Sequence, residues 1–380
     1  MIPELEAGGA ERTTVDIAAA LAARGDRALV ASEGGRLVAE LQARGGEWFD
    51  LPVAAKNPLR MVLNVGRLAA LIRRERVDII HARSRAPAWS ALLAARRTGI
   101  PFVTTFHGAY KQVGRLKALY NSVMARGDAV IANSAFTAGV IAERFPSARD
   151  RIVVIPRGTD LAAFDPARIT PERRNRLAAA WAIAAGDRVV LLPARVSPIK
   201  GHKVAIEAAA RLAGQHPDLV FVMAGDEQGR AGFRAELDAD VAAAGLAGRV
   251  RFVGHCADMP AALSLASVVI APSLVPETFG RAAVEAGAMG RPVVVSDLGA
   301  FAETVLQPPE VDAAARTGWR VPAADANALA EAIEEALLVA PDKGADYGDK
   351  VRAFMLRHFD LPVMTGATLA VYDRLRRRVS

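Results

Sequence analysis

The chain has 380 residues, of which 52% are hydrophobic and 23% charged, as expected for a globular protein with two domains of ordinary size. Its 48 Lys and Arg against 41 Asp and Glu give a net charge of +7, which favours a nucleotide, a phosphorylated substrate or an anionic membrane surface as ligand. The single cysteine, Cys256, excludes an internal disulfide and a cysteine-based metal cluster. No apolar run is long enough to span a bilayer, so we expect a cytoplasmic protein.

A glycine-rich turn lies close to the N-terminus, in the segment EAGGAER. Gly8 and Gly9 allow backbone amides to approach a phosphate or an acceptor, but the G-x-G-x-x-G fingerprint of nicotinamide enzymes is absent here. Because a strand should precede such a turn in an α/β domain, we expect Met1–Pro3 to be the tail of a strand that has lost its first residues.

Aliphatic and β-branched runs alternate with helical patterns along the chain. Strands are predicted at residues 26–32, 77–83, 101–108, 128–134 and 152–158, and again at 187–195, 218–226, 250–255, 267–273, 291–297 and 318–323. This order predicts an α/β fold of two doubly wound domains facing across a cleft, with ligands at the carboxyl ends of the strands. We expect domains at 1–157 and 186–345, a linker at 158–185, and a C-terminal helical segment at 346–380 that returns toward the first domain and packs across both.

Candidate side chains follow two strands of the first half. His107 ends the run TTFHG and could bond a sugar hydroxyl or a transferred oxygen, although a satisfied structural histidine is the alternative. His81 ends the run VDIIHAR and is a weaker candidate for the same reason. The neighbouring Arg83 and Arg85 could meet an anionic acceptor or could simply be solvated.

Two cations flank a Ser-Pro turn in the segment ARVSPIKGH, directly after the predicted strand at 187–195. Arg195 as a planar fork and Lys200 as a point charge can neutralise a diphosphate beside the helix that Gly201 opens. Solvated loop cations are the alternative.

The segment PETFGRAAVE follows the strand at 267–273 and places Glu277 in a turn and Glu285 in the next helix. The backbone N–H groups of Thr278–Gly280 are available to an anion, and the side chain of Glu285 tilts toward the N-terminal end of the helix, which Glu277 also borders. Carboxylates accept hydrogen bonds from neighbouring hydroxyls, so the arrangement fits the phosphates and the two diols of a nucleoside-diphosphate sugar. The alternative is a helix whose early glutamate interacts with the helix dipole.

These motifs occur with others in one order along nearly the whole chain: GGAER, TTFHG, VIANSAFTAGVI, VIPRGTDLAAFDP, ARVSPIKGH, MAGDEQGR, FVGHCADMPAALSLASVVIAPS, PETFGRAAVEAGAMGRPVVVSD and TGWRVPAADANALAEAI. The set resembles the family 4 retaining glycosyltransferases of GT-B architecture, and the two glutamates match that family's E-x7-E motif. The resemblance implies two Rossmann-like domains and sugar transfer from a nucleotide donor, with retention of configuration and without a metal or other cofactor.

By position, the resemblance assigns the donor diphosphate to Arg195 and Lys200, the ribose to Glu285 and the hydroxyls of the transferred sugar to Glu277. It places His107 at the reacting centre, so that His107, Arg195, Lys200 and Glu277 are the implied catalytic residues. The remaining implied donor contacts are Gly8, Gly9, Gly254, His255, Cys256, Thr278, Phe279 and Gly280. One departure from the pattern is Arg157 in VIPRGTD, where the family more often has Asn.

Segments such as HARSRAPAWSALLAARRTGIPFVTTFHGAY resemble bacterial enzymes of lipopolysaccharide or cell-surface polysaccharide assembly. This implies a UDP- or GDP-sugar donor and a glycan or lipid-linked acceptor, and no nucleic-acid partner. The segment YKQVGRLKALYNSVMAR carries Lys111, Arg115, Lys117 and Arg126 between apolar residues. It is either an interfacial helix on the inner membrane or an ordinary amphipathic surface helix.

A D-x-D pair, Asp238 and Asp240, is the metal motif of another glycosyltransferase architecture, but here it lies within a helical pattern where positions i and i+2 diverge. We therefore expect no metal site. Two other functions stay open: a nucleotide-sugar epimerase on the same architecture, and a non-catalytic nucleotide-sugar-binding protein.

Overall fold

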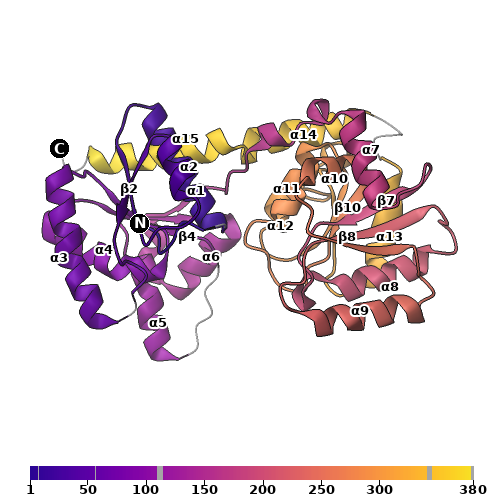
Figure 1. Ribbon diagram of the computed structural model, residues 1–380, viewed down its shortest axis with the longest axis horizontal. Helices are drawn as coiled ribbons and strands as arrows, with labels where there is room; N and C mark the ends of the chain where they lie inside the picture. Colours follow the sequence, from indigo (N-terminus) through magenta and orange to yellow (C-terminus); the bar gives the residue numbers. More distant parts are fainter. Residues whose placement is uncertain (7, 56, 109–113, 340–344, 378–380) are drawn as a thin grey trace. The chain divides into compact units, whose positions relative to one another are not determined.

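The computed structural model describes every residue except 7, 56, 109–113, 340–344 and 378–380, and the chain divides into two compact units (Figure 1). Unit 1 comprises Met1–Gly158 and Leu361–Ser380, and unit 2 comprises Thr159–Asp360. The segment 158–185, expected as a linker, lies in unit 2 from Thr159 onward, and its Trp181 is buried against the sheet. The C-terminal segment forms two helices, α14 (Ala345–Phe359) in unit 2 and α15 (Leu361–Arg376) in unit 1.

Unit 1 contains two parallel sheets and a set of covering helices. Strand β1 (Ala28–Ser32) pairs with β2 (Gly46–Asp50), and a second sheet has the order β3 (Ile80–Ala82), β4 (Phe102–Phe106), β5 (Ala129–Ala132) and β6 (Ile152–Val154). The helices are α1 (Gly9–Ala23), α2 (Val38–Ala43), α3 (Pro58–Glu75), α4 (Arg85–Thr98), α5 (Arg115–Ser122) and α6 (Ala135–Arg144).

The helices of unit 1 bury both faces of the four-stranded sheet. Helices α1 and α15 cover one face with a cluster that includes Ile17, Val103 and Met364. Helices α3 and α4 cover the other face, where Leu68, Leu92 and Phe102 are buried. Strand β4 is buried along its whole length, which explains why its sequence, FVTTF, has no alternation of polar and apolar residues.

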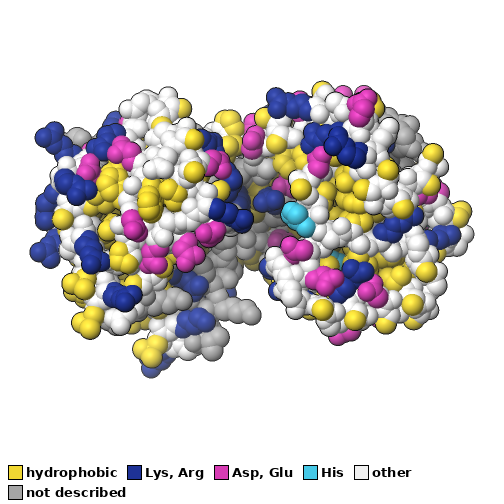
Figure 2. Space-filling model, viewed as in Figure 1, with side chains coloured by type: hydrophobic (Ala, Val, Ile, Leu, Met, Phe, Trp, Pro, Cys, Tyr) yellow, Lys and Arg dark blue, Asp and Glu magenta, His cyan; other side chains and the backbone are white. Residues whose placement is uncertain are grey.

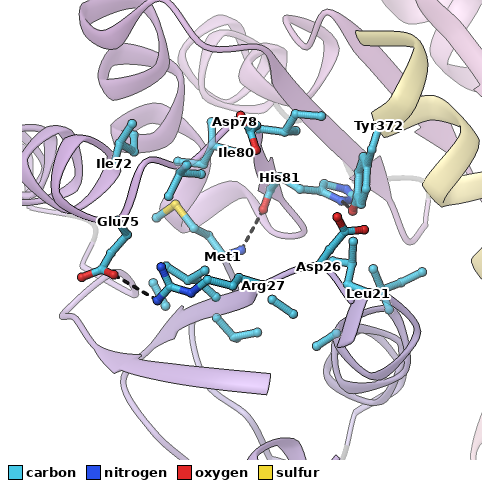
Figure 3. Close-up of a pocket in the computed structure, with 18 of the residues that line it drawn as sticks. Met1, Leu21, Asp26, Arg27, Ile72, Glu75, Asp78, Ile80, His81 and Tyr372 are labelled. Carbon is cyan, nitrogen blue, oxygen red and sulfur yellow. Dashed lines mark hydrogen bonds and ion pairs between the residues drawn. The ribbon is translucent and has the colours of Figure 1, made fainter. Parts of the chain in front are cut away.

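A cavity of about 510 Å³ lies inside unit 1, between β1 and β3 (Figure 3). Residues from α1, α3 and α15 close it, and its labelled lining in Figure 3 includes Ile72, Ile80 and Tyr372. Met1 lines the cavity, and its ammonium group donates to His81 O in β3 at 2.7 Å, while Ile2 N–H donates to Ala31 O in β1 at 3.2 Å. None of the residues predicted to bind the donor lines this cavity.

Unit 2 is built on one parallel sheet with the strand order β12-β11-β10-β7-β8-β9. The strands are β7 (Arg188–Leu192), β8 (Leu219–Ala224), β9 (Val250–Gly254), β10 (Ala266–Ala271), β11 (Val293–Ser296) and β12 (Trp319–Val321). From β7 the chain adds strands toward one edge of the sheet (β8, β9), and from β10 it adds strands toward the other edge (β11, β12). The loops after the neighbouring strands β7 and β10 therefore lie at the topological switch point. Ligands of doubly wound sheets bind at this point.

Helices cover both faces of the sheet of unit 2 (Figure 1). One layer contains α8 (His202–Leu212), α9 (Ala231–Ala243) and α13 (Ala326–Leu337), and the other contains α7 (Pro171–Ala180), α10 (Met259–Leu265), α11 (Arg281–Ala288), α12 (Phe301–Thr304) and α14. Strand β8 is buried at all six residues between these layers. The core therefore fixes the strand ends that carry the candidate site.

Candidate active site

A tight turn follows β7 in unit 2 and presents Lys200. Residues Pro198–Lys200 form a single 3-10 turn, and Gly201 adopts a left-handed conformation with φ of +73° before α8 begins. A Cβ atom on Gly201 would overlap the carbonyl oxygen of Pro272 in the loop after β10. Leu274 N–H also donates to Ile199 O at 2.9 Å, so the two loops are joined through their backbones.

This junction brings Lys200 to Glu277, which lies 77 positions further along the chain. The Lys200 Nζ donates to Glu277 Oε1, and the Ser273 hydroxyl donates to the same oxygen at 2.8 Å. Both charged side chains are about a quarter exposed, at 24% and 23%. Lys200 and Glu277, predicted to contact different parts of one donor, are therefore a direct ion pair.

The backbone of Glu277 is held by the loop that follows β11. Glu277 forms a parallel bridge with Gly299, and Ala300 N–H donates to Glu277 O at 2.8 Å. Gly299 has φ of +68°, and a Cβ atom there would overlap the Glu277 carbonyl. Three strand ends, those of β7, β10 and β11, thus determine the position of one carboxylate.

Helix α11 begins directly after this carboxylate, as the motif predicts. Its N-cap is Gly280 with φ of +81°, where a Cβ atom would approach the Phe301 ring to 2.7 Å. Phe279 is buried against Phe359, with ring centroids 5.9 Å apart. The amides from Thr278 to the first turn of α11 therefore lie on a rigid support at a helix N-terminus, a common anion-binding arrangement.

Glu285 lies in the second turn of α11 and is only 6% exposed. Its Oε1 forms an ion pair with Arg281 Nε at 2.8 Å, one turn closer to the N-terminus of the helix. The carboxylate consequently extends toward the start of α11, in the direction expected from helical geometry.

The other predicted donor residues of unit 2 lie at neighbouring strand ends. Arg195 follows β7, is exposed, and donates to the Gln228 side chain at 3.3 Å. Gly254 and His255 are exposed and Cys256 is half-buried at the end of β9, the edge strand two positions from β7. Burial raises the pKa of the Cys256 thiol.

His107, Gly8 and Gly9 belong to unit 1, whereas the other predicted donor residues belong to unit 2. His107 follows β4, and its Nε2 is shielded from solvent without a hydrogen-bond partner among the described residues. Burial, with smaller contributions from Arg83 and Arg157, lowers the pKa of His107 well below its usual value, so the ring is neutral at pH 7. Gly8 is the N-cap of α1, and Gly9 is its first residue.

His81 is a structural histidine. Its two ring nitrogens bond to the Tyr372 hydroxyl at 2.6 Å and to the Thr105 hydroxyl at 2.7 Å. Burial lowers its pKa well below the usual value. Arg85 donates to the Asn121 side chain at 2.9 Å, whereas Arg83 is 6% exposed and is not solvated.

The aspartates of the D-x-D pair lie on the exposed side of α9. Asp238 pairs with Arg234 at 2.9 Å, and Asp240 lies 3.8 Å from the Lys203 ammonium. Within the described part of the chain, no group of three or more His, Cys, Asp or Glu side chains is arranged to hold a metal ion.

Two polar residues that closely follow strands, Ser273 after β10 and Asn133 after β5, were not predicted as site residues. Ser273 binds the same Glu277 oxygen as Lys200, and Asn133 after β5 is 4% exposed with an unsatisfied Oδ1. Their position directly after predicted strands was the signal that could have indicated them.

Comparison with known proteins agrees with this architecture. Residues 7–163 match Glycosyltransferase Family 4, and residues 173–352 match Glycosyl transferases group 1. The chain is 31% identical to the lipopolysaccharide core biosynthesis mannosyltransferase LpcC of Rhizobium leguminosarum bv. viciae, over 86% of this chain and 85% of that protein. It is 29% identical to a D-inositol 3-phosphate glycosyltransferase of Jonesia denitrificans, over 79% of this chain and 77% of the relative.

The fold is also similar to that of Anabaena Alr3699/HepE, solved in complex with UDP, with a TM-score of 0.81 and 23% identity over 98% of this chain and 99% of the other. The two Rossmann-like units with parallel sheets agree with the two family matches and with the likeness to LpcC over most of both chains. The chain belongs to the family 4 glycosyltransferases of GT-B architecture.

Proposed function

We propose that the protein is a retaining glycosyltransferase that works without a metal and moves a sugar from a nucleoside-diphosphate sugar to a glycan or lipid-linked acceptor. The observation that carries this proposal is the cluster of Lys200, Glu277 and Ser273 beside the N-terminus of α11. It combines a cation, the amides of a helix N-terminus and carboxylate acceptors at the topological switch point of unit 2, and a diphosphate flanked by two diols needs these groups.

In this proposal, Lys200, Arg195 and the amides after Glu277 bind the donor diphosphate. Glu285 accepts hydrogen bonds from the ribose, and Glu277 accepts them from the transferred sugar. Negative charge grows on the diphosphate as the glycosidic bond breaks, so these fixed donors stabilise the transition state more than the ground state. The leaving phosphate takes the proton of the attacking hydroxyl on the same face of the sugar, which retains the configuration.

The donor is proposed to be a UDP- or GDP-sugar. The UDP complex of HepE, whose fold this chain shares, supports a uridine nucleotide as the first candidate. The likeness to LpcC supports an acceptor in lipopolysaccharide or cell-envelope polysaccharide synthesis. A cytoplasmic location is part of the proposal.

A thermal-shift screen with UDP, GDP, ADP and CMP, followed by the sugar donors of the stabilising nucleotide, tests the donor site. Release of the nucleoside diphosphate only when acceptor is added then separates a transferase from a binding protein. We expect turnover to persist in EDTA and the product to keep the anomeric configuration of the donor. If no nucleoside diphosphate stabilises the protein, the donor site is wrongly assigned.

We further propose that α5 contacts the cytoplasmic face of the inner membrane. Leu116 and Leu119 of this helix are 85% and 55% exposed, beside Arg115 and Lys117. Figure 2 shows hydrophobic and basic side chains together on the surface at the place of α5 in Figure 1. This surface is shorter than the segment 110–126 predicted from the sequence. Residues 123–125 are buried, and Arg126 lies over the Trp89 ring, 5.2 Å from its centroid. Lys111 is outside the described residues. No described helix is long and apolar enough to cross a bilayer.

The membrane contact has a direct test. A Leu116→Ser, Leu119→Ser variant should lose binding to vesicles that contain anionic lipid, because exposed apolar side chains and nearby cations act together at such surfaces. Sedimentation with vesicles measures the binding. Equal sedimentation of variant and wild type would contradict the contact.

A further inference from the structure

Arg281 and Glu285 form an ion pair inside the proposed donor site, and the two partners differ sharply in burial. Arg281 is the first residue of α11, directly after the Gly280 N-cap. Its Nε lies 2.8 Å from Glu285 Oε1, one turn further along the helix. The Glu285 side chain is 8% exposed, whereas that of Arg281 is 63% exposed. A solvated arginine is therefore paired with a carboxylate that is almost buried.

The stability of α11 does not account for an arginine at this position. The helix dipole is positive at the N-terminus, so the first turn favours acidic side chains and disfavours cations. A pair of an acid and a base at positions i and i+4 is also better in the reverse order, with the acid nearer the N-terminus. The first turn of α11 contains no acidic residue that would offset this cost. The pair is better explained by the effect of Arg281 on Glu285.

A second pair of the same kind in unit 2 shows the difference. Arg234 and Asp238 of α9 have the same order and spacing and lie 2.9 Å apart, but the Asp238 side chain is 54% exposed. Water solvates that carboxylate, so such a pair contributes little. Glu285 instead lies between Val284 and Ala286, which are fully buried, and an uncompensated charge there costs free energy. Arg281 supplies a compensating charge.

The pair also determines the direction of the carboxylate. A glutamate side chain has several rotatable bonds, and the 2.8 Å contact with Arg281 selects the rotamers that direct the carboxylate toward the start of α11. In the proposed function this carboxylate accepts hydrogen bonds from the ribose. Because a hydrogen bond depends on direction as well as distance, a carboxylate that is already oriented binds a diol with a smaller loss of side-chain freedom.

We propose that Arg281 is a positioning residue of the donor site, which holds the Glu285 carboxylate in the orientation that binds the ribose diol of the nucleotide. The inference rests on the proposed function, in which Glu285 binds the ribose. Arg281 itself contacts neither the diphosphate nor the transferred sugar. Its effect on affinity is therefore confined to ligands that carry the ribose hydroxyls.

Titration calorimetry on the full chain tests this role with three related ligands. The probes are UDP, UMP and 2′,3′-dideoxy-UDP, or the same three forms of whichever nucleoside diphosphate stabilises the protein. We expect Arg281→Met to weaken UDP and UMP by the same factor, at least about tenfold, because both carry the ribose hydroxyls. The dideoxy ligand should bind nearly as it does to wild type. Arg281→Lys should lose less affinity, since an ammonium keeps the charge but not the planar fork.

Two further variants and the kinetics separate positioning from a general loss of structure. Arg234→Met is the matched control, because it removes a pair of the same order and spacing from the same unit, and it should leave all three dissociation constants unchanged. Glu285→Gln should lose the same preference for UDP over the dideoxy ligand, and the double variant should be no worse than either single one. In Arg281→Met the KM of the donor should rise while kcat stays close to wild type, since the ribose contacts are the same in the ground state and the transition state.

Three results overturn the inference. A loss in Arg281→Met that is larger for UDP than for UMP makes Arg281 a phosphate ligand instead. A preference for UDP over the dideoxy ligand that survives in Arg281→Met but is lost in Glu285→Gln refutes the positioning role, while the transferase proposal stands. If no nucleoside diphosphate binds to the wild type, the transferase proposal fails and the inference fails with it. If Arg281→Met does not fold, Arg281→Lys decides the same comparisons.

Discussion

Gly201 determines how closely the turn of Lys200 approaches the loop of Glu277, so Gly201→Ala tests the construction of the donor site. The residue has φ of +73°, and its missing Cβ leaves room for the Pro272 carbonyl, one residue before Ser273. An alanine must therefore adopt a disfavoured backbone conformation and also displace backbone atoms in the neighbouring loop.

The two costs can be separated with Gly248→Ala as a control. Gly248 has φ of +78°, and a Cβ atom there would meet no heavy atom within 4 Å, so the substitution adds backbone strain alone, about 1 kcal/mol. Gly201→Ala adds the same strain and roughly 1–3 kcal/mol for displaced packing. We expect the free energy of unfolding to fall by about 1 kcal/mol in Gly248→Ala and by about 2–4 kcal/mol in Gly201→Ala.

Urea unfolding of unit 2, followed by tryptophan fluorescence, measures these losses, and titration calorimetry with the stabilising nucleotide measures the consequence for binding. Gly201→Ala should weaken the nucleotide at least tenfold, because Lys200 and Glu277 lose their common position, whereas Gly248→Ala should not. Equal losses of stability in the two variants, with equal affinities, would refute the argument that this backbone contact positions the site.

Three further predictions concern single side chains. Lys200→Ala and Arg195→Ala should lower kcat more than they raise KM, since charge on the leaving diphosphate grows in the transition state; near-wild-type turnover in both variants would reject these roles. Burial lowers the pKa of His202 to about 4, so between pH 6.5 and pH 4 this side chain is protonated only in the unfolded chain. The free energy of unfolding should therefore decrease as the pH is lowered through this range. His202→Gln should reduce that decrease in urea titrations. Tyr372→Phe removes the 2.6 Å bond to His81 and should cost about 1–2 kcal/mol in unfolding free energy, measured against wild type at pH 7.5; an unchanged midpoint would contradict a structural role for this pair.

The central strands of unit 2 could be predicted from the sequence because their runs are apolar on both faces. Strand β8, LVFVMA, is an example, since every residue is buried between two helix layers. Strand β2 was missed for the opposite reason. Its sequence, GEWFD, contains a glycine and two acidic residues, and it pairs only with β1 and is largely half-exposed, so its pattern is hidden by polar side chains.

The positions of the motifs were predictable, but their contacts were not. That Glu285 extends toward the start of α11 follows from helix geometry within one turn. The Lys200–Glu277 pair depends on β7 and β10 being neighbours, which only the completed sheet order shows. His81 is satisfied by Tyr372, 291 positions away, and no local pattern around either residue carries that information.

The candidate donor site depends more on backbone contacts than on its charged side chains. Gly201, Gly280 and Gly299 all have positive φ, and at each a Cβ atom would meet a neighbouring loop or ring. These three contacts connect the ends of β7, β10 and β11, and the Lys200–Glu277 pair lies where they meet. Since the cost of ordering these side chains is met when unit 2 folds, the proposed donor diphosphate would not have to order them on binding, which would favour its affinity. Replacement of one charged residue of this pair should therefore remove only the contacts of that side chain. Replacement of any of the three glycines should shift several ligand contacts at once.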